Sequence, residues 1–313
     1  MPRSIRSWVH PLAGVGILAA LLWRLGGGPF VAGLRLIDAT ALGAALGIGV
    51  LTTWACAWRW SLVAGGLGVR LPLHTAVAHC YRATFLNATL PGGVLGDVHR
   101  AMRHGKDSGD VSRGIRAVVW ERAAGTVISV LLATVVLLAF PSPVRRYLPA
   151  VIALAVVAAL VAVLLARFVP ERGPARWSRA LRALRTAKTD IRDGLIARRK
   201  WVGVLLATAV VLAGNLATFL VAARTAGATA PLSQLVPLTL LALLAMVLPA
   251  NVGGFGPREG VAAWAFSAAG LSATQGVATA MVYGALVLVS TLPGAAVLVL
   301  ARRARHRPEE TRV

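Results

Sequence analysis

The sequence predicts an all-α membrane protein with about six transmembrane helices and two oppositely oriented re-entrant segments, arranged as an inverted repeat. Hydrophobic residues make up 57% of the 313 positions and charged residues only 14%. A soluble domain of this size cannot bury so much apolar surface. The apolar residues also gather in runs long enough to cross about 30 Å of hydrocarbon. We therefore expect one polytopic membrane domain over residues 1–313.

Six apolar windows are long enough to span a bilayer. The first follows a short basic N-terminus, and because no small-residue cleavage site comes after it we expect it to be retained. Tryptophans stand near several window ends, where their rings prefer the headgroup level. The last window contains Pro293, which predicts a kink or a broken end. The predicted spans are 9–25, 39–58, 117–140, 148–166, 201–223 and 274–301.

Two short motifs resemble one another: LPGGVLGDVHR at residues 90–100, the first motif, and LPANVGGFGPRE at residues 248–259, the second motif. Aligned at their leucines, with an offset of 158 residues, they agree at five of eleven positions. Interrupted apolar stretches, 72–90 and 232–250, precede them. We interpret both as re-entrant helices with a motif at each tip, because non-helical backbone at depth needs protein or water around it. Full seventh and eighth spans are the alternative.

The net charge of +22 is explained by membrane orientation. Basic residues lie mainly between the apolar runs, and cytoplasmic loops carry such an excess. The segment 167–200 holds eleven Arg or Lys residues and is therefore expected in the cytoplasm, together with both termini. Its part 174–199 has apolar residues at helical spacing and is expected to lie on the inner leaflet. We predict no nucleic-acid partner.

This topology makes the first motif enter from the cytoplasm and the second from outside. Residues 9–140 and 148–301 then form two inverted halves. The offset of 158 also carries the span 117–140 onto 275–298, inside the sixth span. Inverted repeats with broken helices are typical of alternating-access transporters.

Three acids and three arginines accompany the motifs: Asp97, Glu121, Glu259, Arg100, Arg122 and Arg258. Such charges are costly in a bilayer unless they are paired or hydrated. We expect a paired cluster beside a cavity, in which an arginine exchanges a carboxylate for a ligand phosphate. For Glu121 and Arg122, an interfacial salt bridge at a span end is the alternative.

The motif glycines permit positive φ and let backbone N–H groups face a ligand. Asp97 is a suitable N-cap and Pro257 a suitable first helical residue, so each motif ends at a helix N-terminus, which attracts anions. Asn87 and Asn251 add amide groups near the two tips. Cys56 and Cys80 show no metal-ligand spacing, and we predict neither a metal nor a cofactor.

The segments FLNATLPGGVLGDVHR, VVWERAAG and LPANVGGFGPREG, in this order, resemble the lysylphosphatidylglycerol synthase transmembrane, or flippase-like, family. In the synthases of that family this region moves an aminoacylated phospholipid between leaflets, and a separate cytoplasmic domain makes the lipid. We expect a stand-alone member without the aminoacyltransferase domain. One departure is Leu95, which stands where the family pattern has a glycine.

The resemblance implies roles for the matching motif residues, to which the residues themselves add Asn251. The predicted substrate-binding residues are Asn87, Pro91, Gly92, Gly93, Gly96, Asp97, Arg100, Glu121, Arg122, Pro249, Asn251, Gly253, Gly254, Gly256, Arg258 and Glu259.

The predicted function is translocation of an anionic lipid across the bacterial cytoplasmic membrane, without enzymatic activity. The lipid is a phospholipid or a polyprenyl-phosphate-linked glycolipid, and a glycosyltransferase is a possible partner suggested by the resemblance. Two alternatives stay open. One is a scaffold that positions a glycosyltransferase through its basic linker. The other is an intramembrane enzyme that uses Asp97 or Glu259 on a lipid phosphate, although no nucleophile-and-base pair has useful spacing.

Overall fold

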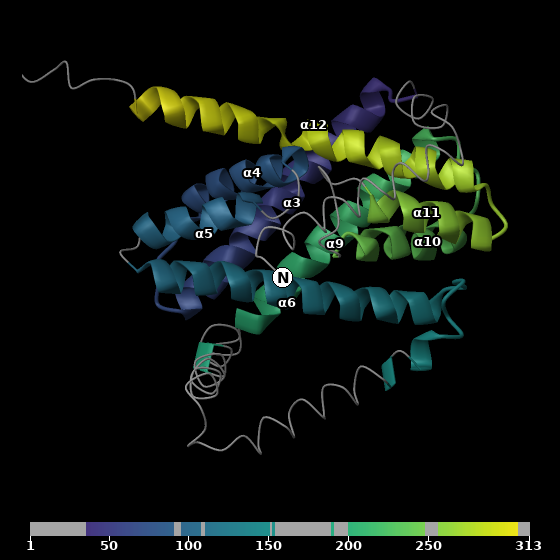
Figure 1. The fold of residues 1–313 in the computed structure, drawn as a ribbon, viewed down its shortest axis with the longest axis horizontal. Helices are drawn as coiled ribbons and strands as arrows, with labels where there is room; N and C mark the ends of the chain where they lie inside the picture. Colours follow the sequence, from purple (N-terminus) through teal and green to yellow (C-terminus); the bar gives the residue numbers. More distant parts are fainter. Residues whose placement is uncertain are drawn as a thin grey trace, which may run out of the picture.

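The structure is a computed structural model that describes residues 36–90, 95–107, 110–150, 152–153, 189–190, 200–247 and 256–305. These residues form helices and connecting turns, with no strand among them (Figure 1). The all-α fold class is thereby confirmed. The principal helices are α3 (Ala39–Gly66), α4 (Leu73–Thr89), α5 (Leu95–Asp107), α6 (Val111–Ala139), α9 (Lys200–Thr225), α10 (Leu232–Ala245), α11 (Pro257–Ala268) and α12 (Ala273–Arg305).

Four of these helices are long and apolar enough to cross a membrane: α3, α6, α9 and α12 as far as Leu300. They confirm four predicted spans, 39–58, 117–140, 201–223 and 274–301. The predicted spans 9–25 and 148–166 lie outside the described residues, apart from a few positions of the second. The chain is a multi-pass α-helical membrane protein.

Both ends of α3 carry recognisable caps. Asp38 precedes the helix, and its carboxylate accepts hydrogen bonds from the Ala41 N–H at 2.8 Å and the Thr40 hydroxyl. The Thr40 hydroxyl and then the Ala41 N–H hold the pKa of Asp38 below its ordinary value. At the other end Gly68 has a φ of 78° and the Val69 N–H bonds back to the Ala64 carbonyl. This is the helix-terminating geometry that glycine favours.

The two motif regions are each a pair of helices interrupted at the motif. In the first half α4 is followed by α5, and the two helices pack on one another. In the second half α10 and α11 are related in the same way. Motif residues 91–94 and 248–255 lie outside the described residues. The re-entrant interpretation therefore stays a prediction.

Very close helix contacts explain individual glycines. A Cβ on Gly96 of α5 would lie 2.1 Å from the Ala83 carbonyl oxygen of α4. In the second half, a Cβ on Gly276 of α12 would lie 2.4 Å from the Ala262 carbonyl oxygen of α11. Only glycine allows these backbones to approach so closely, as is common between membrane helices.

The helix bounds recur with the offset of 158 that aligns the motifs. Adding 158 to α3 gives 197–224, against 200–225 for α9, and adding it to α4 gives 231–247, against 232–245 for α10. The same shift places α5 at 253–265, against 257–268 for α11, and α6 at 269–297, against 273–305 for α12. Each described helix of the first half therefore has a counterpart in the second.

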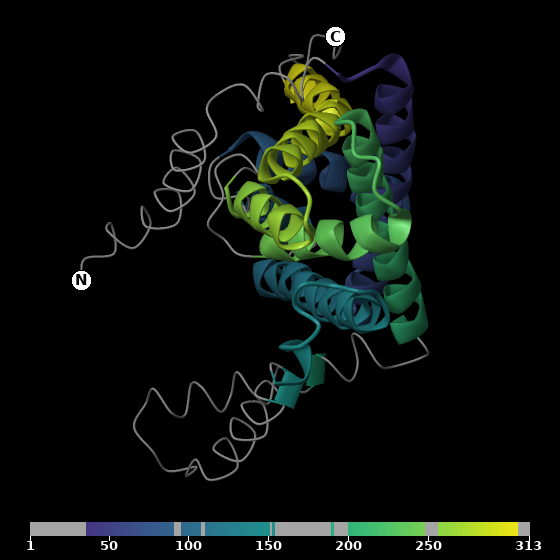
Figure 2. The same ribbon diagram turned by 90° about the vertical axis from the view of Figure 1, so that its right-hand side faces the viewer.

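The packing of the halves follows the same correspondence. The counterparts α3 and α9 pack on one another. The contact of α3 with α12 corresponds to the contact of α9 with α6. In the same way, the contact of α4 with α12 corresponds to the contact of α10 with α6. Figure 2 shows α3 and α9 side by side. They run antiparallel, because Gly203 of α9 lies against Leu62 of α3 whereas Gly214 lies against Ile48. In Figure 1, α6 and α12 also run in opposite directions. An inverted repeat has this arrangement.

Candidate functional site

A cavity of about 450 Å³ lies between the two halves. Residues of α3, α4 and α6 from the first half line it, together with residues of α9, α10, α11 and α12 from the second. Three arginines, Arg59, Arg122 and Arg258, contribute to its wall. Asn87, Asn215 and a series of Ser and Thr side chains provide further polar groups. Its volume is in the range of small-molecule binding sites.

Glu121 of α6 is the centre of a buried charge network. Its Oε1 accepts hydrogen bonds from Arg59 Nε at 2.8 Å and Arg59 Nη2 at 2.5 Å. Its Oε2 accepts from Arg100 Nη2 at 2.6 Å. All three side chains are buried, so each charge depends on the others for the stabilisation that water would otherwise give.

Two neighbours hold these arginines in place. The guanidinium of Arg100 lies over the Trp60 ring, 4.5 Å from the ring centre. Arg59 Nη1 donates to the Thr208 hydroxyl of α9 at 3.1 Å. A Cβ on Gly125 would lie 2.7 Å from Arg59 Nη1, so the absence of a side chain at Gly125 makes room for the guanidinium.

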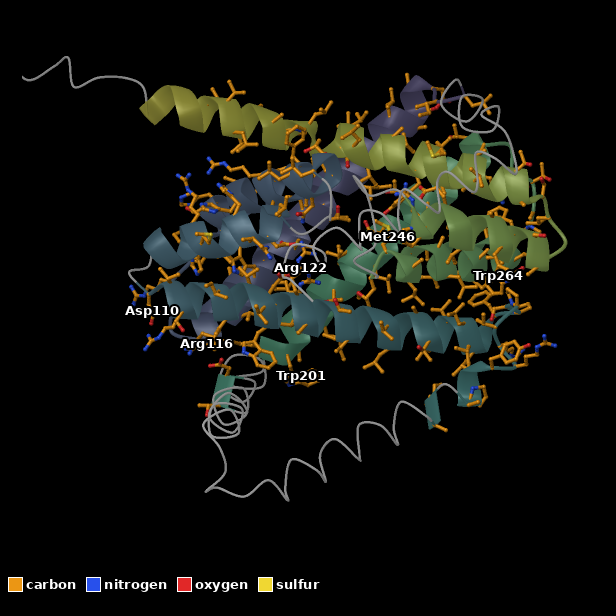
Figure 3. The ribbon with its side chains drawn as sticks, viewed as in Figure 1. Asp110, Arg116, Arg122, Trp201, Met246 and Trp264 are labelled. Carbon is orange, nitrogen blue, oxygen red and sulfur yellow. The ribbon has the colours of Figure 1, made fainter. Side chains whose placement is uncertain are left out.

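Asp97 joins the first motif to α6. Its Oδ1 accepts from Arg122 Nη2 at 2.7 Å, and Arg100 Nη2 lies 3.3 Å away. Its Oδ2 accepts from Asn87 Nδ2 at 3.0 Å, and Asn87 Oδ1 accepts from the Gly96 N–H at 2.8 Å. The Arg122 side chain is 45% exposed although it lies in the middle of the molecule, because it faces the cavity (Figure 3).

The second motif ends in a more local ion pair. Glu259 accepts from Arg258 Nε at 2.9 Å and also contacts Arg258 Nη2. The other oxygen of Glu259 accepts from the Gly256 N–H at 2.6 Å, which caps the start of α11. The guanidinium of Arg258 lies 5.1 Å from the Tyr283 ring centre, and Tyr283 stacks on Phe219. Arg258 and Glu259 are both buried.

In each of three described ion pairs the arginine lines the cavity and its carboxylate partner does not. Arg59, Arg122 and Arg258 line the cavity, whereas their partners Glu121, Asp97 and Glu259 are not among the described residues of its wall. The carboxylates therefore stand behind the guanidinium groups. Arg100, one of the three arginines that we expected to exchange a carboxylate for a ligand phosphate, also lies outside the described lining.

Residues 11–294 match the family described as the lysylphosphatidylglycerol synthase TM region. The chain belongs to this family. No curated protein and no solved structure matches the chain. Because the family name refers to a membrane lipid, this member of the lysylphosphatidylglycerol synthase TM family is a membrane protein related to lipids.

Nine of the sixteen predicted site residues lie within the described part of this family member. Six of them form the network of Asp97 and Glu121, namely Asn87, Gly96, Asp97, Arg100, Glu121 and Arg122. Gly256, Arg258 and Glu259 form the second group. The remaining seven, Pro91, Gly92, Gly93, Pro249, Asn251, Gly253 and Gly254, lie outside the described residues.

Some local expectations need correction. Asp97 is not the N-cap of α5, because the helix already begins at Leu95 and Asp97 lies in its first turn. Gly96 is not at positive φ but serves the close contact with α4, and its N–H is bonded to Asn87. Gly256 does have positive φ, at 128°, and Pro257 is the first residue of α11, as predicted.

Several residues of the site were not predicted, among them Arg59, Trp60 and Tyr283. Arg59 lies one residue beyond the predicted end of a span, but α3 continues through it to Gly66. Trp60 and Tyr283, whose rings lie under the two motif arginines, stand outside the motifs and were not predicted as site residues. The apolar run that follows Arg59 was the available signal, since it indicates that the helix and the membrane segment do not end at the charge.

Proposed function

We propose that this protein moves an anionic lipid between the leaflets of a membrane, without changing the lipid chemically. The observation that carries the proposal is the cavity between the two halves, with three guanidinium groups on its wall and their carboxylates behind them. The lipid is a phospholipid or a polyprenyl-phosphate-linked glycolipid.

The physical obstacle to lipid exchange is the headgroup. A charged group at the bilayer centre costs several kcal/mol on insertion scales, whereas the acyl or prenyl chains stay in hydrocarbon throughout. A polar cavity within the helix bundle lowers this cost for the headgroup alone. The helices need only open toward the bilayer far enough to leave the chains outside.

Guanidinium groups suit a transient phosphate site. Arg presents a planar set of donors that matches carboxylate and phosphate equally well, so it can exchange one partner for the other. Arg122 is the most accessible of the three, and its present partner is Asp97. We propose that Arg122 and Arg258 bind the phosphate while Asp97 and Glu259 hold them when the cavity is empty.

The arrangement of the halves supports alternating access. In inverted-repeat transporters a site near the midplane is exposed to the two sides in turn by the movement of one part against another. The recurrent helix bounds and the antiparallel counterparts fit such a design. We further propose that the two motifs are the gates, that both termini are cytoplasmic in a bacterial inner membrane, and that segment 174–199 binds the inner leaflet.

Lipid exchange in proteoliposomes tests the proposal. Acyl-labelled lipids are reconstituted with the full chain, and an impermeant reductant reports the fraction in the outer leaflet over time. We expect accelerated exchange of an anionic lipid with the wild type, and strong loss with Arg258→Ala and with Asp97→Asn. Arg146→Ala, at an exposed arginine outside the cavity, is the matched control and should behave like the wild type.

The same experiment separates the alternatives. Mass spectrometry of the recovered lipids shows a mass change if the protein is an enzyme. If no lipid exchanges faster than in empty vesicles, and if charge-reversing variants in 174–199 are the only ones with an effect in cells, the scaffold explanation replaces the proposal.

A further inference from the structure

The cavity wall has a second polar region that the ion pairs do not use. Five of its hydroxyl side chains donate to a backbone carbonyl of their own helix, at 2.7 to 3.1 Å. These five residues, which we call the hydroxyl zone, are Thr52, Thr84, Thr218, Ser290 and Thr291.

Helix contacts place the hydroxyl zone at one junction. A Cβ on Gly214 of α9 would lie 2.2 Å from the Thr52 side chain, and one on Gly49 of α3 would lie 2.6 Å from the Ser290 Cβ. Gly294 of α12 approaches the Tyr81 carbonyl of α4 in the same way. The zone is thus the meeting point of α3, α4, α9 and α12.

The hydroxyl zone lies between the two ends of the cavity that carry guanidinium groups, because Arg59 follows it on α3 whereas Tyr283, the ring under Arg258, packs with Ala41 and Ala45 near the start of α3. Thr52 precedes Arg59 by seven residues on α3, and Ser290 follows Tyr283, the ring under Arg258, by seven residues on α12. Seven residues of an α-helix rise about 10 Å. A ligand with its phosphate at either end would reach Thr52 and Ser290 only with groups attached beyond that phosphate.

The zone offers acceptors to such groups. A hydroxyl whose hydrogen is donated to its own helix presents only its oxygen lone pairs to a neighbour. Thr208 already shows this use, since it donates to the Val204 carbonyl at 2.7 Å and accepts from Arg59 Nη1 at 3.1 Å. The hydroxyl zone is therefore complementary to several hydroxyl donors at once.

The charge of the site also favours a particular kind of headgroup. Four guanidinium groups, those of Arg59, Arg100, Arg122 and Arg258, stand with three carboxylates in the described networks. A phosphodiester carries one negative charge, which balances this excess.

We infer that the cavity takes a phosphodiester headgroup that carries hydroxyl groups, such as a glycerol, inositol or sugar phosphodiester, in preference to one without hydroxyl groups. This inference rests on the proposed function and narrows it. The phosphate lies at Arg122 or at Arg258, and from either position the polyol extends to the hydroxyl zone between them.

The test compares lipids with identical labelled acyl chains and different headgroups. Phosphatidylglycerol and phosphatidylinositol carry hydroxyls, whereas phosphatidylmethanol is an anionic phosphodiester without them. Because the hydroxyl lipids would gain two neutral hydrogen bonds, we expect them to exchange about tenfold faster than phosphatidylmethanol.

A double variant tests the hydroxyl zone separately from the arginines. Thr52→Val with Thr218→Val keeps the side-chain shape but removes two acceptors, and should abolish the preference over phosphatidylmethanol. Thr134→Val is the control, because Thr134 donates to Val130 in the same way but lies outside the cavity wall. An unchanged preference in the double variant, or equal exchange of phosphatidylglycerol and phosphatidylmethanol by the wild type, would overturn the inference.

A binding measurement distinguishes failure of this inference from failure of the proposed function. If no labelled lipid exchanges, the proposed transport function is wrong. Thermal stabilisation of the purified full chain by the same lipids then tests the headgroup preference alone. Stronger stabilisation by phosphatidylglycerol than by phosphatidylmethanol, lost in the double variant, supports the inference. Equal stabilisation by both lipids refutes it.

Discussion

Arg100 and Arg258 are separated by the 158 residues that relate the two halves, and each lies over an aromatic ring beside a buried carboxylate. The two sites are nevertheless unequal. Arg258 lines the central cavity, whereas Arg100 is held by Glu121 outside the described lining. We therefore expect substitutions at these equivalent positions to have different consequences.

Arg258→Lys should reduce lipid exchange by about tenfold or more with a small effect on folding. Lysine keeps the charge but loses the planar set of donors and the stacking on Tyr283. The measurement is the exchange rate in proteoliposomes, with Arg146→Lys as the control. Wild-type exchange by Arg258→Lys would show that only the charge at this position matters.

Glu121→Gln should strongly destabilise the fold. It leaves the guanidinium groups of Arg59 and Arg100 buried without their shared carboxylate, and breaking one partner of a buried pair costs about 3–5 kcal/mol. Unfolding in detergent measures the change. Asp110→Asn is the matched control, because Asp110 pairs with Arg113 at the surface, where such pairs contribute about 0–1 kcal/mol. Similar losses in both variants would contradict the buried network.

Gly125→Ala should impair both stability and exchange, although alanine is the better helix former. Its Cβ would collide with the Arg59 guanidinium, which Glu121 and Thr208 prevent from moving away. Gly43→Ala in α3 provides the comparison, since a Cβ there meets nothing within 4 Å. That variant should be stabilised by about 0.5–1 kcal/mol. The readouts are the unfolding midpoint and the exchange rate, and a neutral Gly125→Ala would mean that Arg59 is not fixed.

Topology gives a fourth prediction. If the halves are inverted as proposed, the turn after α6 faces the outside, so a cysteine at Ser142→Cys in a chain lacking Cys56 and Cys80 should react with an impermeant maleimide in intact spheroplasts. A cysteine at Ser178→Cys, in the basic linker, should react only after lysis. Labelling of both before lysis would reject the inverted arrangement.

The fold was largely predictable because hydropathy is a local property. The four described spans were located within a few residues at most ends. The misplaced end of α3 arose because Arg59 counts as a charge in any local window, while its partner Glu121 is 62 residues away in the sequence. The helix passes through Arg59 since that charge is neutralised in the folded protein.

The site was predictable in composition but not in connectivity. The acids and arginines beside the motifs were expected to pair, and Arg258 with Glu259 and Arg122 with Asp97 do so. That Arg100 would turn toward Glu121, and that Asn87 would take the Gly96 N–H, depends on how α4, α5 and α6 pack. Helix packing is set by contacts distant in sequence, so no local pattern indicates it.

The contact of Gly49 with Ser290 joins the two halves, and both residues also belong to the cavity wall. The interface along which the halves would slide is thus the same surface that would surround the bound headgroup. A headgroup that fills the cavity would hold the two halves apart, and its departure would let the interface between them close. Loading and motion would then be governed by one set of side chains rather than by two sets that must communicate.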